Sequence, residues 1–165
     1  MSGAGRRPVV QLARALPPIE RLIPHRGIML WLEGVSAGDD SAIETHATVP
    51  AAAWYLDEQG EMPAWIGIEL MAQAVAAHVG LRGWLAGTPP KPGELLGSRA
   101  YRASASSVPP GTRLQVSARM SYSDESGFGV YDCAIRCLSG HIASAALKVY
   151  QPADFAAFLQ SAAGA

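Results

Sequence analysis

The sequence of 165 residues carries little that would point to a membrane, a nucleic acid or the secretory pathway. Its formal net charge is −1, so no excess of basic residues favours nucleic acid. No apolar run reaches the ~20 residues of a membrane span. Near the N-terminus, Arg14 interrupts the short apolar stretch and no small-residue cleavage site follows, so we expect no signal peptide. We therefore expect neither a membrane nor a nucleic-acid partner.

Cysteine is also scarce, with Cys133 and Cys137 as the only two. On the strand predicted for them they would lie roughly 13 Å apart at ~3.3 Å per residue, too far for a disulfide. Free thiols without an export signal predict a cytoplasmic protein. The sequence has no His, Cys, Asp and Glu constellation with metal-ligand spacing, no Gly-rich phosphate loop and no Gly-x-Ser-x-Gly motif, so we expect no metal and no cofactor.

What is present fits a globular protein, because 49% of the residues are hydrophobic and 16% are charged. The length suits one domain with a sizeable core. We expect residues 1–16 to form a flexible tail and residues 17–162 to form a single domain.

The pattern of apolar residues predicts two strands, one long helix and four more strands. The expected ranges are 27–36 and 41–49 for the first hairpin, 63–86 for the helix, 94–105, 112–124, 127–138 and 141–151 for the later strands, and 152–162 for a short C-terminal helix. An antiparallel sheet wrapped around the long helix satisfies this order. The fold class is therefore α+β.

The helix at 63–86 is apolar on nearly every side, which predicts that it is buried, yet it carries Glu69. An unpaired carboxylate in a core costs several kcal/mol, so Glu69 needs a partner or a function. Gln73 follows four residues later on the same side and can bind the carboxyl group or a ligand. A buried carboxyl group suits a general acid or base, whereas the ordinary alternative is a surface acid with its head in water.

A histidine would complete an acid–base pair, and His25 is the best candidate among four. His46 falls within a predicted strand, and His141 begins another. His78 lies nine residues after Glu69, about 900° of helix rotation, so it faces away from Glu69. The alternative for His25 is a structural hydrogen bond to a nearby backbone carbonyl.

Two motifs resemble a known family. "LIPHRGIMLWLEGV" resembles the Leu-Pro-His-Arg opening of the 3-hydroxyacyl-ACP dehydratases of fatty acid synthesis (ACP, acyl carrier protein), and "GIELMAQAVA" resembles the helix of the same family that carries Glu-Ala-Met-Ala-Gln. The similarity covers residues 18–150 and is closest to the dehydratase-like proteins of aryl-polyene-type gene clusters. It implies the hotdog fold, in which two subunits pair into one continuous sheet.

The resemblance implies a substrate, partners and site residues. The expected substrate is a thioester of acyl carrier protein or coenzyme A, bound in an apolar tunnel along the helix. The expected assembly is a homodimer or higher oligomer, or a heterodimer with a related dehydratase. The family's catalytic Gly-His-Phe-Pro motif is missing, because Tyr55 stands at the offset of its histidine and residues 47–77 contain no histidine. By this resemblance Glu69 corresponds to the glutamate of the family's helix, whereas no histidine of this sequence corresponds to the family's catalytic histidine.

Dehydration needs an acid for the departing hydroxyl group and a base for the α-proton. We expect Glu69 to be the acid and His25 the base, facing each other across one substrate molecule at a few Å beyond hydrogen-bond reach. Backbone N–H groups of Ile66 and Gly67 at the helix start are expected to bind the thioester oxygen, and Trp65 and Gln73 complete the expected substrate-binding residues. Two alternatives stay open: a thioesterase that acts through Glu69, and a non-catalytic subunit that supports an active dehydratase.

Overall fold

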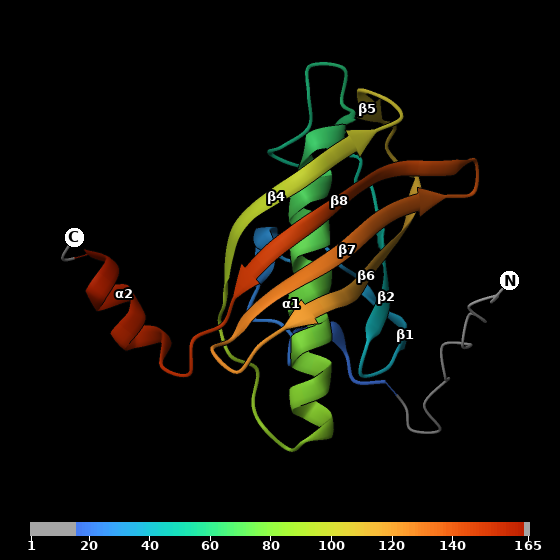
Figure 1. Cartoon of the computed structure of the whole chain (residues 1–165). Helices are drawn as coiled ribbons and strands as arrows, with labels where there is room; N and C mark the ends of the chain where they lie inside the picture. The colour runs from blue at the N-terminus through green and yellow to red at the C-terminus, as the bar shows by residue number, and fades with distance from the viewer. Residues whose placement is uncertain (1–15, 164–165) are drawn as a thin grey trace, which may run out of the picture.

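The computed structural model describes residues 16–163, in which a curved antiparallel sheet wraps around one long helix, α1 (Gly67–Leu85) (Figure 1). The sheet runs in the order β1-β2-β6-β7-β8-β4. The strands are β1 (Gly34–Gly38), β2 (Ala42–Thr48), β4 (Glu94–Ala103), β6 (Arg113–Ser123), β7 (Phe128–Cys137) and β8 (Gly140–Tyr150). This is the α+β hotdog architecture that the sequence predicted. The expected tail, apart from residue 16, lies outside the described residues.

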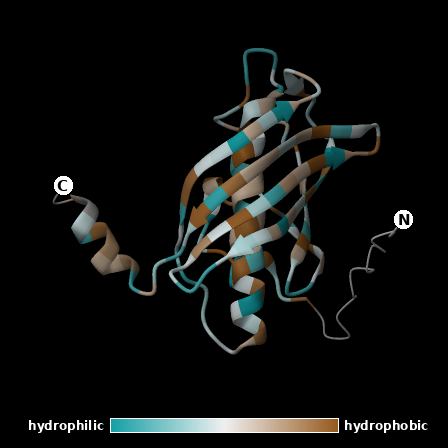
Figure 2. Ribbon diagram, in the orientation of Figure 1, coloured by the Kyte–Doolittle hydropathy of each residue, from teal (hydrophilic) through white to brown (hydrophobic). Residues whose placement is uncertain are grey.

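The strands alternate in burial because one face packs on the helix and the other faces outward. In β6, Leu114 and Val116 are buried, whereas Arg113 and Gln115 on the opposite face are exposed. The same alternation of apolar and polar residues is visible along the neighbouring strands (Figure 2). The apolar face of the sheet therefore forms the wall of the core.

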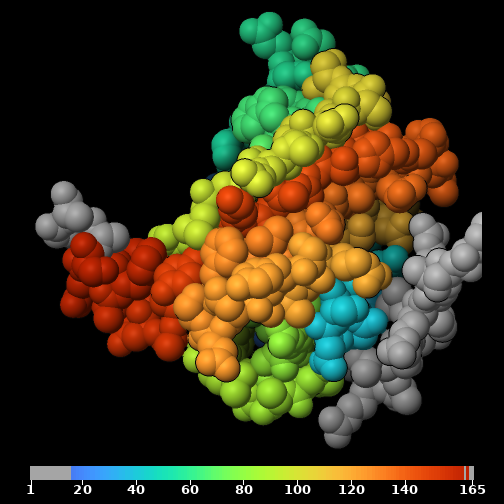
Figure 3. Space-filling view, in the orientation of Figure 1, coloured from blue at the N-terminus to red at the C-terminus, as the bar shows by residue number. Residues whose placement is uncertain are grey.

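The helix α1 supplies the centre of that core, with Met71, Ala74, Ala77 and Leu81 fully buried. The segment Ala64–Leu85 is long and apolar enough to cross a membrane by length and composition, but 67% of its apolar window is buried inside the fold. In Figure 3 the strands cover the middle of α1, and residues near its C-terminal end emerge beneath them. We therefore interpret α1 as the core helix.

The start of α1 is anchored by a short pair of strands that the sequence did not predict. β3 (Met62–Pro63) pairs with β5 (Ser107–Val108), and the Ala64 N–H donates to the Ser106 carbonyl at 2.8 Å. The 3-10 turn η3 (Ala64–Ile66) leads directly into the helix. These contacts set where the helix begins and so where Glu69 stands.

The N-terminal segment packs against α1 at Gly80. Ile19, Leu22 and Ile23, in and after the 3-10 turn η1 (Ile19–Arg21), are buried in the core. A Cβ atom at Gly80 would collide with the backbone carbonyl of Leu22. Glycine is thus required for this approach, which places the following residues, including His25, beside the helix.

The first strand is shorter than predicted, and the expectation of a strand from residue 27 was wrong. Residues Gly27–Met29 form a 3-10 turn, η2, in which Gly27 has a φ of 57°. The side chain of Gln73 binds the Met29 carbonyl and the Trp31 N–H. A side chain thus takes the hydrogen bonds that a neighbouring strand would otherwise make, and the apolar pattern does not reveal this.

The C-terminal helix α2 (Phe155–Ala163) lies apart from the sheet in Figure 1. Its Phe158 ring packs edge-on against Tyr150 at the end of β8, with 5.4 Å between the ring centroids. The predicted short helix is therefore confirmed, but it adds little to the core around α1.

Candidate active site

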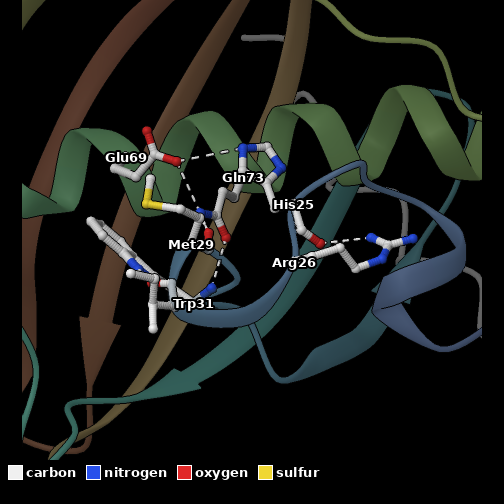
Figure 4. A network of polar contacts seen from close by, with 7 residues as sticks. His25, Arg26, Met29, Trp31, Glu69 and Gln73 are labelled. Atoms are coloured by element: carbon white, nitrogen blue, oxygen red, sulfur yellow. Dashed lines mark hydrogen bonds and ion pairs between the residues drawn. The ribbon is translucent and has the colours of Figure 1, made fainter.

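Glu69 and Gln73 project from the same side of α1, as their four-residue spacing predicted. Gln73 is fully buried, and its Nε2 donates to Glu69 Oε1 at 2.9 Å and to the Met29 carbonyl at 2.7 Å. Its Oε1 accepts the Trp31 N–H at 3.0 Å. Gln73 therefore joins the loop before β1 to the helix and orients the Glu69 carboxyl group (Figure 4).

His25 reaches the same carboxyl group from the N-terminal segment. Its Nε2 lies 3.6 Å from Glu69 Oε1 within one chain (Figure 4). The guanidinium of Arg26 holds the surrounding loop, because it donates to the carbonyls of Ile23 at 2.7 Å, His25 at 2.6 Å and Glu20 at 2.7 Å. The structure thus brings together the two residues that the sequence singled out. At 3.6 Å they lie closer than expected, because a separation of a few Å beyond hydrogen-bond reach would be needed for a substrate to lie between them.

The His25 ring is not fixed by a backbone carbonyl. Its Nδ1 atom is buried and has no hydrogen-bond partner among residues 16–163. A buried ring nitrogen without a partner is unusual in a folded protein. The structural alternative for His25 therefore finds no support in the described part of the chain.

Glu69 is less buried than the apolar residues around it in the helix led us to expect. Its side chain is 33% exposed and that of His25 is 27% exposed. The reason is that this face of α1 is not covered by the sheet but opens into a cleft. The expectation of a buried acid is therefore met only in part in the single chain.

The cleft has a volume of about 280 Å³ and runs along α1 from the His25–Glu69 pair. Its helix side is lined by small apolar residues at helical spacing: Ala72, Val75, Ala76 and Val79. The opposite wall comes from residues 91–95 at the start of β4 and residues 149–151 at the end of β8. An apolar cleft that leads away from an acid–base pair suits an acyl chain.

The four expected substrate-binding residues do not line this cleft. Trp65 is 63% exposed on the surface, and Ile66 and Gly67 are buried. The Gly67 N–H donates to the Ala64 carbonyl, which also accepts the Tyr101 hydroxyl, so it is not available to a thioester oxygen. Gln73 uses its amide on protein groups. Their expected roles as direct ligands are not supported by these positions.

The residue at the offset of the family histidine belongs to an aromatic cluster. The Tyr55 ring lies 4.4 Å from Trp31, and Trp54 packs edge-on against Tyr55 at 5.7 Å. Burial raises the pKa of the Tyr55 hydroxyl. Trp31 belongs to the loop that Gln73 binds, and Tyr55 is not among the residues that line the cleft, so position 55 packs against the loop rather than the cleft.

The other histidine on α1 faces the core, as the helix rotation predicted. His78 Nδ1 lies 3.0 Å from the Tyr131 hydroxyl and Nε2 lies 3.0 Å from the Asp39 carbonyl. Burial lowers the pKa of His78 and raises that of Tyr131 to about 12. Within residues 16–163, no group of three or more His, Cys, Asp or Glu side chains could hold a metal ion.

Comparison with known proteins places the chain in a family. The family described as ApeP-like, ApeP dehydratase, matches residues 17–160. A solved structure of the dehydratase heterocomplex ApeI:P from Xenorhabdus doucetiae is similar, with 29% identity, a TM-score of 0.81, and coverage of 89% of this chain and 97% of that chain. No match was found among curated proteins.

More distant structures share the fold. The PaaI protein from the phenylacetic acid degradation operon of E. coli has 16% identity and a TM-score of 0.57, covering 71% of this chain and 81% of that chain. A hypothetical thioesterase from Streptococcus pneumoniae, solved with coenzyme A, has 14% identity and a TM-score of 0.57, covering 71% and 83%. At these identities the likeness extends to the fold alone.

Proposed function

Since the chain belongs to the ApeP-like dehydratase family, we propose that it removes water from a 3-hydroxyacyl thioester of acyl carrier protein. The product is the 2-enoyl thioester, as in fatty-acid- or polyene-type chain synthesis. The observation that carries the proposal is the His25–Glu69 pair, 3.6 Å apart at the head of an apolar cleft. The assignment of Glu69 as acid and His25 as base is part of the proposal.

The short separation favours a substrate that lies across the pair rather than between its members. The α- and β-carbons are about 1.5 Å apart, so a proton and a hydroxyl group on the same face of that bond are close neighbours. A base and an acid 3.6 Å apart can each reach one of them from that face. The geometry thus suits a syn elimination.

In the proposed step, the pair takes up one proton at His25 and gives away one proton from Glu69. Neutral His25 takes the α-proton, the C–H electrons form the double bond, and the C–O bond breaks as protonated Glu69 gives its proton to the leaving hydroxyl group. This leaves an imidazolium and a carboxylate 3.6 Å apart. A proton transfer between them, direct or through one water, restores the starting state.

Gln73 has a positioning role in this proposal. Its Nε2 donates to Glu69 Oε1, the same oxygen that faces His25. Because Gln73 also binds the loop before β1, it ties the orientation of the acid to the segment that carries the base. A small misplacement of such groups has large effects on rate.

We further propose that the chain works as an assembly through its β4 edge. β4 ends the sheet, and Leu95 and Leu96 there are 41% and 52% exposed. A long exposed edge strand is normally paired or covered. Because Leu95 also lines the cleft, a subunit bound at this edge would adjoin the site. Sedimentation of a stable monomer at micromolar concentration, alone and mixed with a related dehydratase, would contradict the assembly.

A second candidate is a non-catalytic subunit of a dehydratase heterocomplex. Two observations favour it: the missing Gly-His-Phe-Pro histidine and the fact that the similar ApeI:P structure is a heterocomplex. In this role the chain would bind and stabilise a related dehydratase that supplies the complete acid–base pair.

One assay separates these functions. The purified chain is incubated with a 3-hydroxyacyl thioester of acyl carrier protein, then with the coenzyme A thioester, and the products are identified by mass spectrometry. An enoyl thioester supports the dehydratase, and free thiol indicates a thioesterase. No product from the chain alone, together with increased turnover by an added related dehydratase, indicates the supporting subunit.

A further inference from the structure

The cleft does not end at its far side. A second hollow of about 420 Å³ continues along α1 and shares Val79, Lys91 and Gln151 with the first cleft. Its helix side is formed by Arg82, Gly83 and Ala86. The two hollows together follow one face of the helix from Glu69 to Ala86.

The lining changes in character along this path. Beside the His25–Glu69 pair the helix side presents only alanine and valine, whereas the helix side of the second hollow carries Arg82. Asp40 and Thr88 join the lining only in the second hollow, and Lys91 and Gln151 line both hollows. Arg82 contacts the Met120 sulfur at 3.6 Å, and neither Arg82 nor Lys91 has a carboxylate within 4.0 Å in the described residues 16–163. Two cationic side chains, Arg82 and Lys91, and one carboxylate, Asp40, thus line the second hollow, and Lys91 lies where it meets the first cleft.

We propose, on the basis of the dehydratase function above, that the second hollow is a subsite for a polar end group of the acyl chain. The group it would take carries oxygen atoms that accept hydrogen bonds, such as a carboxylate or a hydroxyl group. Arg82 and Lys91 would donate to that group. The substrate class is then a long 3-hydroxyacyl chain with a polar terminus rather than a terminal methyl group.

The acyl chain, and not the arm of the carrier, is the better occupant of the path between the two ends. A pantetheine arm has two amide groups, and the alanine and valine side chains on the helix side offer them no hydrogen-bond partners, so only the opposite wall could supply partners. Polar groups buried without partners cost about 1–3 kcal/mol each. A hydrocarbon chain has no such cost against the same surface.

The distance between Glu69 and Arg82 sets the length of an acyl chain that spans both hollows. Glu69 and Arg82 are 13 residues apart on α1, about 20 Å at ~1.5 Å per residue. A zigzag chain advances ~1.2 Å per bond, by analogy with an extended polypeptide, so about 16 bonds beyond C3 span this distance, which corresponds to an acyl chain of about 19 carbons. Shorter chains would bind at the catalytic pair without reaching the second hollow.

The test compares pantetheine thioesters of 3-hydroxyacyl chains with about 19 carbons that differ only in a methyl, hydroxyl or carboxylate terminus. Binding is measured by calorimetry on the full chain, so the result does not depend on turnover. We expect the carboxylate form to bind about tenfold more tightly than the methyl form, and the corresponding pair with eight carbons to differ by less than twofold. Equal affinities of the long methyl and carboxylate forms would overturn the proposal.

Variants of the lining residues test whether Arg82 and Lys91 cause the preference for the carboxylate terminus. Lys91→Gln and Arg82→Gln should each reduce the preference for the carboxylate terminus to about threefold or less, whereas Arg136→Gln, at an exposed arginine of β7, should leave it unchanged. Lys91 is exposed, so its variant is informative even if Arg82→Gln unfolds. A preference that neither variant reduces would place the end group elsewhere and refute the subsite.

Two further measurements distinguish a carrier-phosphate site and a failed dehydratase function from the proposed subsite. Tighter binding of 4′-phosphopantetheine thioesters that is lost in Lys91→Gln would mean that the hollow takes the carrier phosphate, which also overturns the proposal. Failure of the dehydratase function itself has a different signature: no enoyl product from any of these thioesters, whatever their affinities.

Discussion

Replacing Gln73 by methionine tests how the site is held together. Methionine has a similar length and no hydrogen-bonding amide, so Gln73→Met removes the bonds to Trp31, Met29 and Glu69. At about 1 kcal/mol for each hydrogen bond, we expect the free energy of unfolding to fall by about 3 kcal/mol. The loop before β1 would lose its connection to α1, and Glu69 would lose its fixed orientation.

The same variant should lose activity beyond what its lower stability explains. A catalytic group displaced by about 1 Å costs up to ~10²-fold in rate, so kcat should fall by roughly that factor under conditions where the variant is still folded. Urea unfolding gives the stability, and enoyl formation gives the rate. Gln115→Met is the matched control, because Gln115 is exposed on β6 and makes one bond, to Glu44; its unfolding free energy should change by less than about 0.5 kcal/mol. A Gln73→Met protein with normal stability and normal turnover would refute the positioning role of Gln73.

Three other predictions concern residues around the site. His25→Asn should fold with unchanged stability and lose turnover by at least ~10²-fold, whereas a loss of stability on urea unfolding would indicate a structural role. Gly80→Ala should destabilise the protein and lower turnover together, because its Cβ collides with the Leu22 carbonyl; unaltered unfolding and kinetics would argue against that packing. Burial lowers the pKa of His78 in the folded protein. As the pH falls below ~6.5, His78 therefore gains a proton in the unfolded chain at a pH where it is still neutral in the folded protein. Stability should therefore drop by up to about 1 kcal/mol per pH unit in that range, and His78→Gln, compared by urea unfolding at pH 7.5 and 5.5, should show a smaller drop.

Local patterns in the sequence were sufficient for most of the fold. Alternating apolar residues located β6, β7 and β8 to within a residue or two, and the apolar run located α1. The four-residue spacing placed Glu69 and Gln73 on one side of α1, where one of the two expected partners of Gln73, the carboxyl group, is the one that it binds, and nine residues of helix rotation placed His78 on the far side. These predictions succeeded because each depends on neighbours along the chain.

The remaining features depend on contacts between distant segments. The first strand begins late because Gln73, some 42 residues away, binds the backbone at Trp31. The far wall of the cleft exists because Glu94 on β4 pairs with Tyr150 on β8. Ala72, Ala76 and Val79 were within reach of sequence reasoning, since they follow Glu69 at helical spacing, but the wall opposite them was not.

Turnover by the Glu69→Gln variant tests the central claim most directly. Glutamine keeps the shape of the side chain and cannot supply the proton, so enoyl formation from the 3-hydroxyacyl thioester should fall by at least ~10²-fold relative to the unmodified chain. Glu58→Gln, at an exposed glutamate in the loop before β3, is the matched control and should keep full activity. Near-normal turnover by Glu69→Gln would contradict the assignment of Glu69 as the catalytic acid.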